Sequence, residues 1–103
     1  YDDKSEIRIE TIKISVDSVL SNKTLGELKL PMRTGIIVVA IKDNATGQLY
    51  FNPSFNSVIK PGDLLIILGP GKKISLLDKL IEINDLNEFD MKKNAIEEVS
   101  SEV

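Results

Sequence analysis

The chain has 103 residues, of which 42% are hydrophobic and 28% charged, so it is long enough for one globular domain and too short for two. It contains no cysteine and no histidine, which excludes disulfides, thiolate nucleophiles, histidine acid–base catalysis and the usual zinc sites. The net charge of −3, without a basic block, gives a nucleic-acid surface no electrostatic support. We therefore expect one domain that is not an enzyme, holds no metal and binds no nucleic acid.

The two ends of the chain differ in composition from its middle. Residues 1–6 are polar, without the basic start of a signal peptide and without an initial Met, so we expect a flexible N-terminus on a fragment of a longer protein. Residues 84–103 carry six acidic and two basic side chains, so the excess of negative charge belongs to this tail. We expect the tail to be weakly helical, disordered or docked on something else, and the domain itself to span residues 7–83.

Alternating apolar and polar residues predict a first strand over residues 7–16. The apolar positions change phase within it, from odd to even numbers: Ile7, Ile9, Ile12, Ile14 and Val16. Because strand side chains alternate between two faces, both sets share one face only if an extra residue is inserted. We predict a β-bulge or a change of sheet face near Glu10–Ile12, the alternative being that residues 7–9 are a frayed extension.

The stretch Thr24-Leu25-Gly26-Glu27 has the form of a capping box. The Thr24 hydroxyl would accept from the amide of residue 27, and the Glu27 carboxylate would accept from the Thr24 amide. Pro31 forces an extended conformation on the residue before it, which ends a helix. We predict a short helix over residues 24–29.

Two uninterrupted apolar runs predict the central strands of a sheet, at residues 36–42 and 64–68. Residues 48–51 follow a turn cluster and predict a hairpin partner for the first run, and an amphipathic helix is expected over residues 72–83. Neither run approaches the roughly 18 residues of a membrane span. The expected fold is α+β, with a small, mainly antiparallel four-stranded sheet in the order β-α-β-β-β-α.

The predicted core contains nine residues: Ile14, Leu25, Leu28, Val38, Ala40, Leu65, Ile67, Leu77 and Leu80. Both central strands are apolar on both faces, yet one helix is wide enough to cover only one face. We therefore expect a homodimer in which a second copy covers part of the other face, with the side of Ile37, Val39 and Ile41, or its neighbour, at the interface.

No catalytic constellation stands out in the sequence. Gly69-Pro70-Gly71-Lys72-Lys73 suggests a phosphate-binding loop, but Ile66 stands where the first glycine is needed, and Lys73 replaces the required Ser or Thr. A plain strand–helix connection explains the stretch better. Arg33 could bind a phosphate or carboxylate, and a surface or intersubunit salt bridge is its competing role. An enzyme that relies on Lys, Asp or Ser alone is a further, weaker alternative.

Five pieces, in order, resemble the TrkA C-terminal domain, the C-lobe of RCK potassium-regulatory proteins. They are the opening at residues 19–28, the strand at 34–41, the Asn-Pro pair at 52–53, the Pro-Gly-Asp stretch at 59–69 and the final helix. The resemblance covers about residues 7–83. It implies an α+β homodimer that is a cytoplasmic regulatory domain of a potassium channel or potassium uptake system, held at the membrane by its transporter rather than inserted in it.

The resemblance also implies what the domain binds. Several family members bind a small ligand between two copies, and the glycine fingerprint of the separate Rossmann lobe is absent here, so NAD or ATP is not implied. The competing hypothesis is a ligand-free dimerisation scaffold that couples the subunits of a transport complex.

Some family members bind cyclic di-AMP through an Arg, an Asn, two aliphatic residues and a Pro. Pro53 matches that proline, whereas Ile37 stands where the Asn would be, and Arg33 lies two places after the family's arginine. The resemblance thus implies a pocket for a small anionic or nucleotide-like effector, without implying this ligand. From the expected dimer we place any such pocket at the seam between the two copies, where an arginine and backbone amides could receive an anion. The residues expected near it are Arg33, Ile37, Val38, Pro53 and Phe55.

Overall fold

The structure of the chain is a computed structural model, and it describes residues 6–84 and 86. Four strands form one antiparallel sheet in the order β1-β4-β2-β3. Their bounds are Ile7–Lys13 for β1, Ile37–Lys42 for β2, Leu49–Phe51 for β3 and Leu64–Pro70 for β4. The predicted α+β fold is confirmed, and the two apolar runs do form the central strands.

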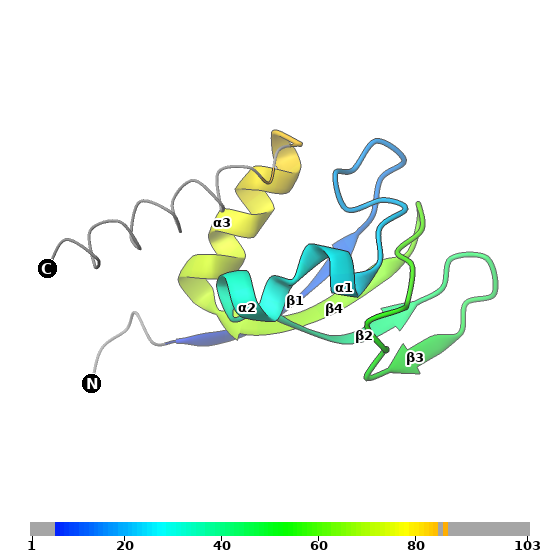
Figure 1. The fold of residues 1–103 in the computed structure, drawn as a ribbon, viewed down its shortest axis with the longest axis horizontal. Helices are drawn as coiled ribbons and strands as arrows, with labels where there is room; N and C mark the ends of the chain where they lie inside the picture. The colour runs from blue at the N-terminus through cyan, green and yellow to red at the C-terminus, as the bar shows by residue number, and fades with distance from the viewer. Residues whose placement is uncertain (1–5, 85, 87–103) are drawn as a thin grey trace, which may run out of the picture.

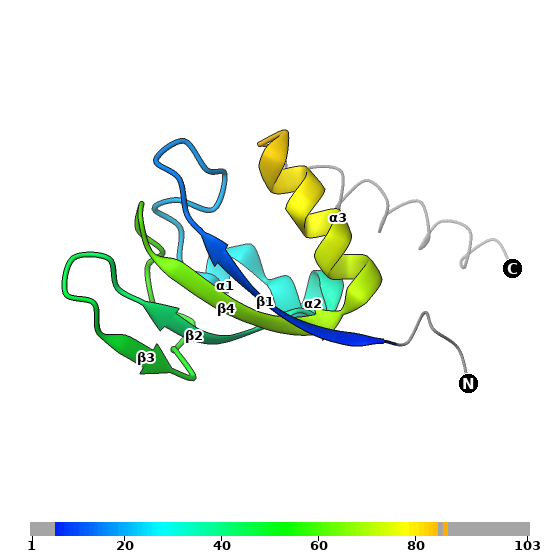
Figure 2. The ribbon, with the colours of Figure 1, turned by 180° about the vertical axis from the view of Figure 1, so that it is seen from behind.

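Three helices lie on one face of this sheet, and within residues 6–84 no helix lies over the other face (Figures 1 and 2). They are α1 (Leu25–Leu28), α2 (Leu30–Thr34) and α3 (Gly71–Glu82). We call the two sides the covered face and the open face. Among the described residues, no helix is long and apolar enough to cross a membrane.

The region around Pro31 differs from the prediction of one helix over residues 24–29. Lys29 has left-handed backbone, with φ of 51°, and it separates α1 from α2. Pro31 lies in the first turn of α2, where a helix amide has no partner and the missing N–H of proline costs nothing. The predicted stop is therefore the start of a second short helix.

The predicted bulge in β1 is wrong. β1 pairs with β4 in unbroken register from Ile7↔Pro70 to Lys13↔Leu64. The other option, a change of sheet face by the apolar residues, is confirmed: Ile7 and Ile9 lie on the open face and are 70% and 68% exposed, whereas Ile12 lies on the covered face and is 9% exposed. Ile7 and Ile9 are hydrogen-bonded strand residues rather than a frayed extension, and the strand ends at Lys13 instead of residue 16.

The bulge lies in β2 instead, where the register shifts between Val38 and Ala40. Ile37 is opposite Leu68 on the open face and is 51% exposed, whereas Ile41 is opposite Leu65 on the covered face and is 6% exposed. An inserted residue reverses the face that later residues take. The expected grouping of Ile37, Val39 and Ile41 on one side is therefore wrong.

The core fills the space between the covered face and the three helices. Seven of the nine predicted core residues are buried, and Leu25 and Val38 are only partly buried because they line a recess described below. The prediction missed four residues that are fully buried: Leu20, Ile36, Ile59 and Ile74. Leu20 and Ile59 lie outside helices and strands, where periodicity gives no signal. The predictions for residues 1–5, 85 and 87–103 lie outside the described residues.

Candidate functional site

A recess of about 340 Å³ lies between the two short helices, the start of β2 and the segment that follows β3. We call it the apolar recess, and its lining carries one charged group, the Lys29 ammonium, and no carboxylate. The lining residues are Leu25, Gly26, Lys29, Leu30, Pro31, Met32, Ile37, Val38, Asn52, Pro53 and Phe55.

The capping box that begins α1 fixes one wall of the apolar recess. The Glu27 amide donates to Thr24 Oγ1 (3.1 Å), and the Thr24 amide donates to Glu27 Oε1 (3.0 Å), as the sequence predicted. The bond from the Thr24 amide lowers the pKa of the Glu27 carboxyl group. This reciprocal pair sets where α1 starts and therefore where Leu25 and Gly26 face the recess.

Backbone hydrogen bonds join α1 to the opposite wall. The Gly26 amide donates to the Phe55 carbonyl (2.8 Å), and the Leu25 amide donates to the Ser57 carbonyl (3.1 Å). A Cβ on Gly26 would stand 3.1 Å from the Phe55 oxygen and 3.4 Å from the Phe55 ring. The absence of a side chain at Gly26 thus permits Phe55 to lie directly beside α1.

Four of the five residues expected to form a pocket line the apolar recess: Ile37, Val38, Pro53 and Phe55. Arg33 does not. Its guanidinium donates to the Leu28 carbonyl (2.9 Å) and to the Leu86 carbonyl (3.4 Å), so it ties the end of α1 to the segment after α3. The sequence places Arg33 close in number to the recess, but the turn of α2 points its side chain elsewhere.

The cation of the recess is Lys29, which sequence reasoning missed. Its left-handed backbone is the link between α1 and α2, and it places Lys29 at the recess. Nothing in a single Lys before Leu30 and Pro31 announces this geometry. A lysine at a helix end, two residues before a proline, is a weak local signal.

The recess is rimmed by apolar side chains that water reaches. Met32 is 76% exposed, Phe55 71% and Ile37 51%. An apolar hollow with one ammonium group suits a ligand with a flat apolar part and a negative group. It offers no paired acid and base, since none of its lining side chains is a carboxylate, hydroxyl or imidazole.

A large pKa shift lies away from this recess. Burial, together with the hydrogen bond and charge of Glu10, raises the pKa of Asp78 from 3.8 to about 6. Asp78 is on α3 and Glu10 on β1, and Arg8 donates from one guanidinium to both Glu10 and Ser75 of α3. This group of side chains joins α3 to an edge strand of the sheet, and it serves the fold.

The comparisons with known proteins agree with this geometry. The TrkA-C domain family matches residues 9–82. The RCK_C domain dimer of S. agalactiae BusR in complex with c-di-AMP has a TM-score of 0.63 and 28% identity, over 73% of this chain and 96% of that one. In the complex of BusR with its busAB-promotor DNA, the same match covers only 35% of the BusR chain. No curated protein matches the sequence.

Two further structures share the fold at lower identity. The RCK C domain of the potassium transport protein KtrA, in complex with c-di-AMP, has a TM-score of 0.64 and 24% identity, covering 74% of this chain and 85% of that one. The GsuK RCK domain has a TM-score of 0.63 and 20% identity, covering 79% of this chain and 17% of that one. With a family match over most of its length and this fold, the chain belongs to the TrkA-C domain family.

Proposed function

We propose that this chain is the effector-sensing, dimerising domain of a regulator of potassium transport, and that the effector binds in the apolar recess. The observation that carries the proposal is the recess itself. Four pocket residues that the sequence singles out converge there, beside Lys29 and the exposed ring of Phe55. The domain is proposed to sense rather than catalyse, and to act in the cytoplasm at a membrane-embedded channel or transporter.

The lining favours a nucleotide-like effector. Phe55, Met32 and Ile37 offer apolar surface to a flat ring, and the Lys29 ammonium can pair with a phosphate. The BusR domain, at 28% identity, is described in complex with c-di-AMP, which makes this compound the first to test. Two features weigh against it here: Ile37 supplies no polar group, and Arg33 is engaged with the Leu28 carbonyl outside the recess.

A second copy is proposed to complete the site. The rim residues Met32, Ile37 and Phe55 form an exposed apolar patch, and a twofold partner would bury this patch against the same patch of the second copy. The BusR relative is described as a dimer of this domain. The competing proposal from the sequence, a scaffold without a ligand, would need the same dimer with the recess filled by side chains.

A different output is also compatible with this sensor. The BusR chain, which this domain matches at 28% identity, is described bound to promotor DNA, whereas the KtrA and GsuK matches lie at 24% and 20%. The second candidate function is therefore the effector domain of a DNA-bound regulator. In that case a separate DNA-binding segment would contact the nucleic acid, since this domain has no basic block.

The test is calorimetry on the chain with c-di-AMP, AMP, ATP and NAD, together with sedimentation at micromolar concentration. We expect one of these nucleotides to bind, and Lys29→Gln and Phe55→Ala each to weaken its binding about tenfold, a loss of one good contact. Phe51→Ala is the matched control, because Phe51 is equally exposed but lies outside the recess. A dimer that binds none of the four compounds would favour the ligand-free dimerisation scaffold. A chain that stays monomeric would contradict both the scaffold and the effector site completed by a second copy.

A further inference from the structure

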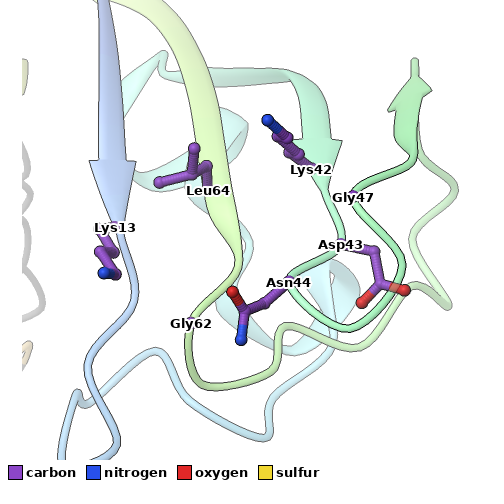
Figure 3. Close-up of a pocket in the computed structure, with 7 residues that line it drawn as sticks. All are labelled: Lys13, Lys42, Asp43, Asn44, Gly47, Gly62 and Leu64. Atoms are coloured by element: carbon purple, nitrogen blue, oxygen red, sulfur yellow. The ribbon is translucent and has the colours of Figure 1, made fainter.

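A second recess, of about 350 Å³, lies at the far end of the sheet, where β1 and β2 end and β4 begins (Figure 3). It shares no lining residue with the apolar recess. We call it the basic recess, because two of its lining residues are lysines and one is an aspartate. The lining residues are Lys13, Lys42, Asp43, Asn44, Gly47, Gly62 and Leu64.

The register of the sheet brings the two lysines to one place. Lys13 and Lys42 are both opposite Leu64, one on each neighbouring strand, so all three side chains share the open face. Neighbouring strands lie about 4.8 Å apart, which puts the two lysine backbones roughly 10 Å from each other with Leu64 between them. Figure 3 shows this arrangement, with Asn44 and Gly62 beside the start of β4.

Neither lysine has a partner within the described part of the chain: residues 6–84 and 86 give Lys13 and Lys42 no ion pair and no side-chain hydrogen bond. The nearby carboxylates are already engaged. Asp43 accepts from Lys60 Nζ (3.0 Å) and from Thr46 Oγ1 (2.9 Å), and the bond to Lys60 lowers its pKa. The two ammonium groups therefore face open solvent with their charge uncompensated.

The floor of the basic recess is held rigid by a buried carboxylate. The Asp63 carboxylate, in a residue that is 1% exposed, accepts from the backbone amide of Asn44 (2.9 Å) in the hairpin loop. It also accepts from the backbone amide of Lys60 (3.0 Å) in the turn before β4. The Asp43–Lys60 pair spans the same two loops. Because these two loops are already tied together in the free protein, ligand binding needs to order little of the chain and loses little conformational entropy.

Gly62 makes room for the third polar group of the recess. Its φ is 89°, and a Cβ there would stand 2.5 Å from Asn44 Nδ2. Only glycine at position 62 thus leaves room for the side-chain amide of Asn44 over the turn at this end of the sheet. Besides Asp43, whose carboxylate is bonded to Lys60 and Thr46, the recess is lined by two lysines, the Asn44 side-chain amide and the half-buried Leu64.

We propose that the basic recess binds a small soluble compound with two linked phosphate groups, at a site independent of the apolar recess. Lysine is a point-charge phosphate ligand, and two lysines on either side of one strand suit an anion with two heads better than a single phosphate. Leu64 offers an apolar surface to the organic part of such a compound. The site goes beyond the proposed effector site, because the two recesses share no lining residue and lie at opposite ends of β2.

The test titrates the chain with inorganic pyrophosphate, orthophosphate and succinate at fixed ionic strength, followed by amide chemical shifts. We expect pyrophosphate to bind more tightly than either other anion and to shift the amides of Asn44, Gly47 and Gly62, while those of Gly26 and Phe55 stay unchanged. Equal binding of all three anions would overturn the proposal that the ligand carries two linked phosphate groups. Shifts confined to the apolar recess, or no binding at all, would overturn the site.

Charge variants separate the site from general electrostatics. Lys13→Gln combined with Lys42→Gln should weaken pyrophosphate binding by about tenfold or more, the loss expected for charge-assisted contacts. Lys72→Gln combined with Lys79→Gln removes the same net charge from α3 and should leave affinity within about twofold. Both pairs are exposed, so folding should survive, which an unchanged melting temperature would verify. An equal loss in the two double variants would contradict the proposal.

Discussion

The two faces of the sheet are built from similar residues and end in opposite states. On the covered face, Leu65, Ile67 and Ile41 are 0%, 0% and 6% exposed, whereas on the open face Ile7 and Ile9 remain about 70% exposed. β4 shows both states within one strand, because its side chains alternate between fully and partly buried. The difference shows that an apolar strand residue is not a core residue until another element lies over it.

The largest expected effect tests this contrast directly. Ile67→Ala should lower the free energy of unfolding by about 2–5 kcal/mol, since it leaves a cavity under the helices. Ile9→Ala, on the open face of the adjacent strand, should cost well under about 1 kcal/mol in dilute solution. Urea unfolding of both variants checks the pair. Equal losses would mean that Ile9 is covered in solution, and a loss that grows with protein concentration would identify a second copy as the cover.

A second prediction sharpens the contrast by adding an atom instead of removing some. Gly69 lies on the covered face, and a Cβ there would stand 3.1 Å from both Cα and Cγ1 of Ile36. Because a backbone atom cannot move aside cheaply, Gly69→Ala should cost about 1–3 kcal/mol. Thr11→Ala on the open face should be within about 0.5 kcal/mol of the parent. A neutral Gly69→Ala in thermal unfolding would show that this part of the covered face is loosely filled.

A third prediction concerns the helices that make one face covered. Thr24→Ala removes the hydroxyl that caps α1 and should cost about 1 kcal/mol, whereas Thr24→Ser should retain most of the stability. The same change should weaken ligand binding in the apolar recess, because α1 forms one of its walls. Melting temperature and calorimetry measure the two effects. Loss of stability in both variants would show that the methyl group, not the cap, is what counts.

The smallest expected effect is a dependence of stability on pH at the edge of the covered face. The pKa of Asp78 is raised to about 6 in the folded chain, mainly by burial and then by Glu10. An acid with a raised folded pKa takes up a proton on folding, so its contribution is full below pH 3.8 and is lost as pH rises toward 6. Asp78→Asn should flatten stability in this window, measured by melting temperature from pH 4 to 7. A parent and variant with parallel pH profiles would contradict the assignment to Asp78.

Much of the fold was predictable because its signals are local. The apolar runs before Lys42 and after Asp63, the capping box at Thr24 and the amphipathic α3 each depend on neighbours within a few residues. The candidate site was predictable only in part. Ile37, Val38, Pro53 and Phe55 were predicted to lie near one pocket, and the structure places all four along the apolar recess, whereas Arg33 lies outside it.

The sequence by itself determined the central strands, the first helix start and the family of this chain, since these follow from local patterns of polarity and from motifs in fixed order. Only the tertiary structure decided which face of each strand is covered, that the bulge lies in β2 rather than β1, and that Lys29 rather than Arg33 faces the apolar recess. It also brought Lys13 and Lys42 together across β4. These outcomes depend on strand register and on the direction of a single turn, which are set by contacts between residues far apart in the chain.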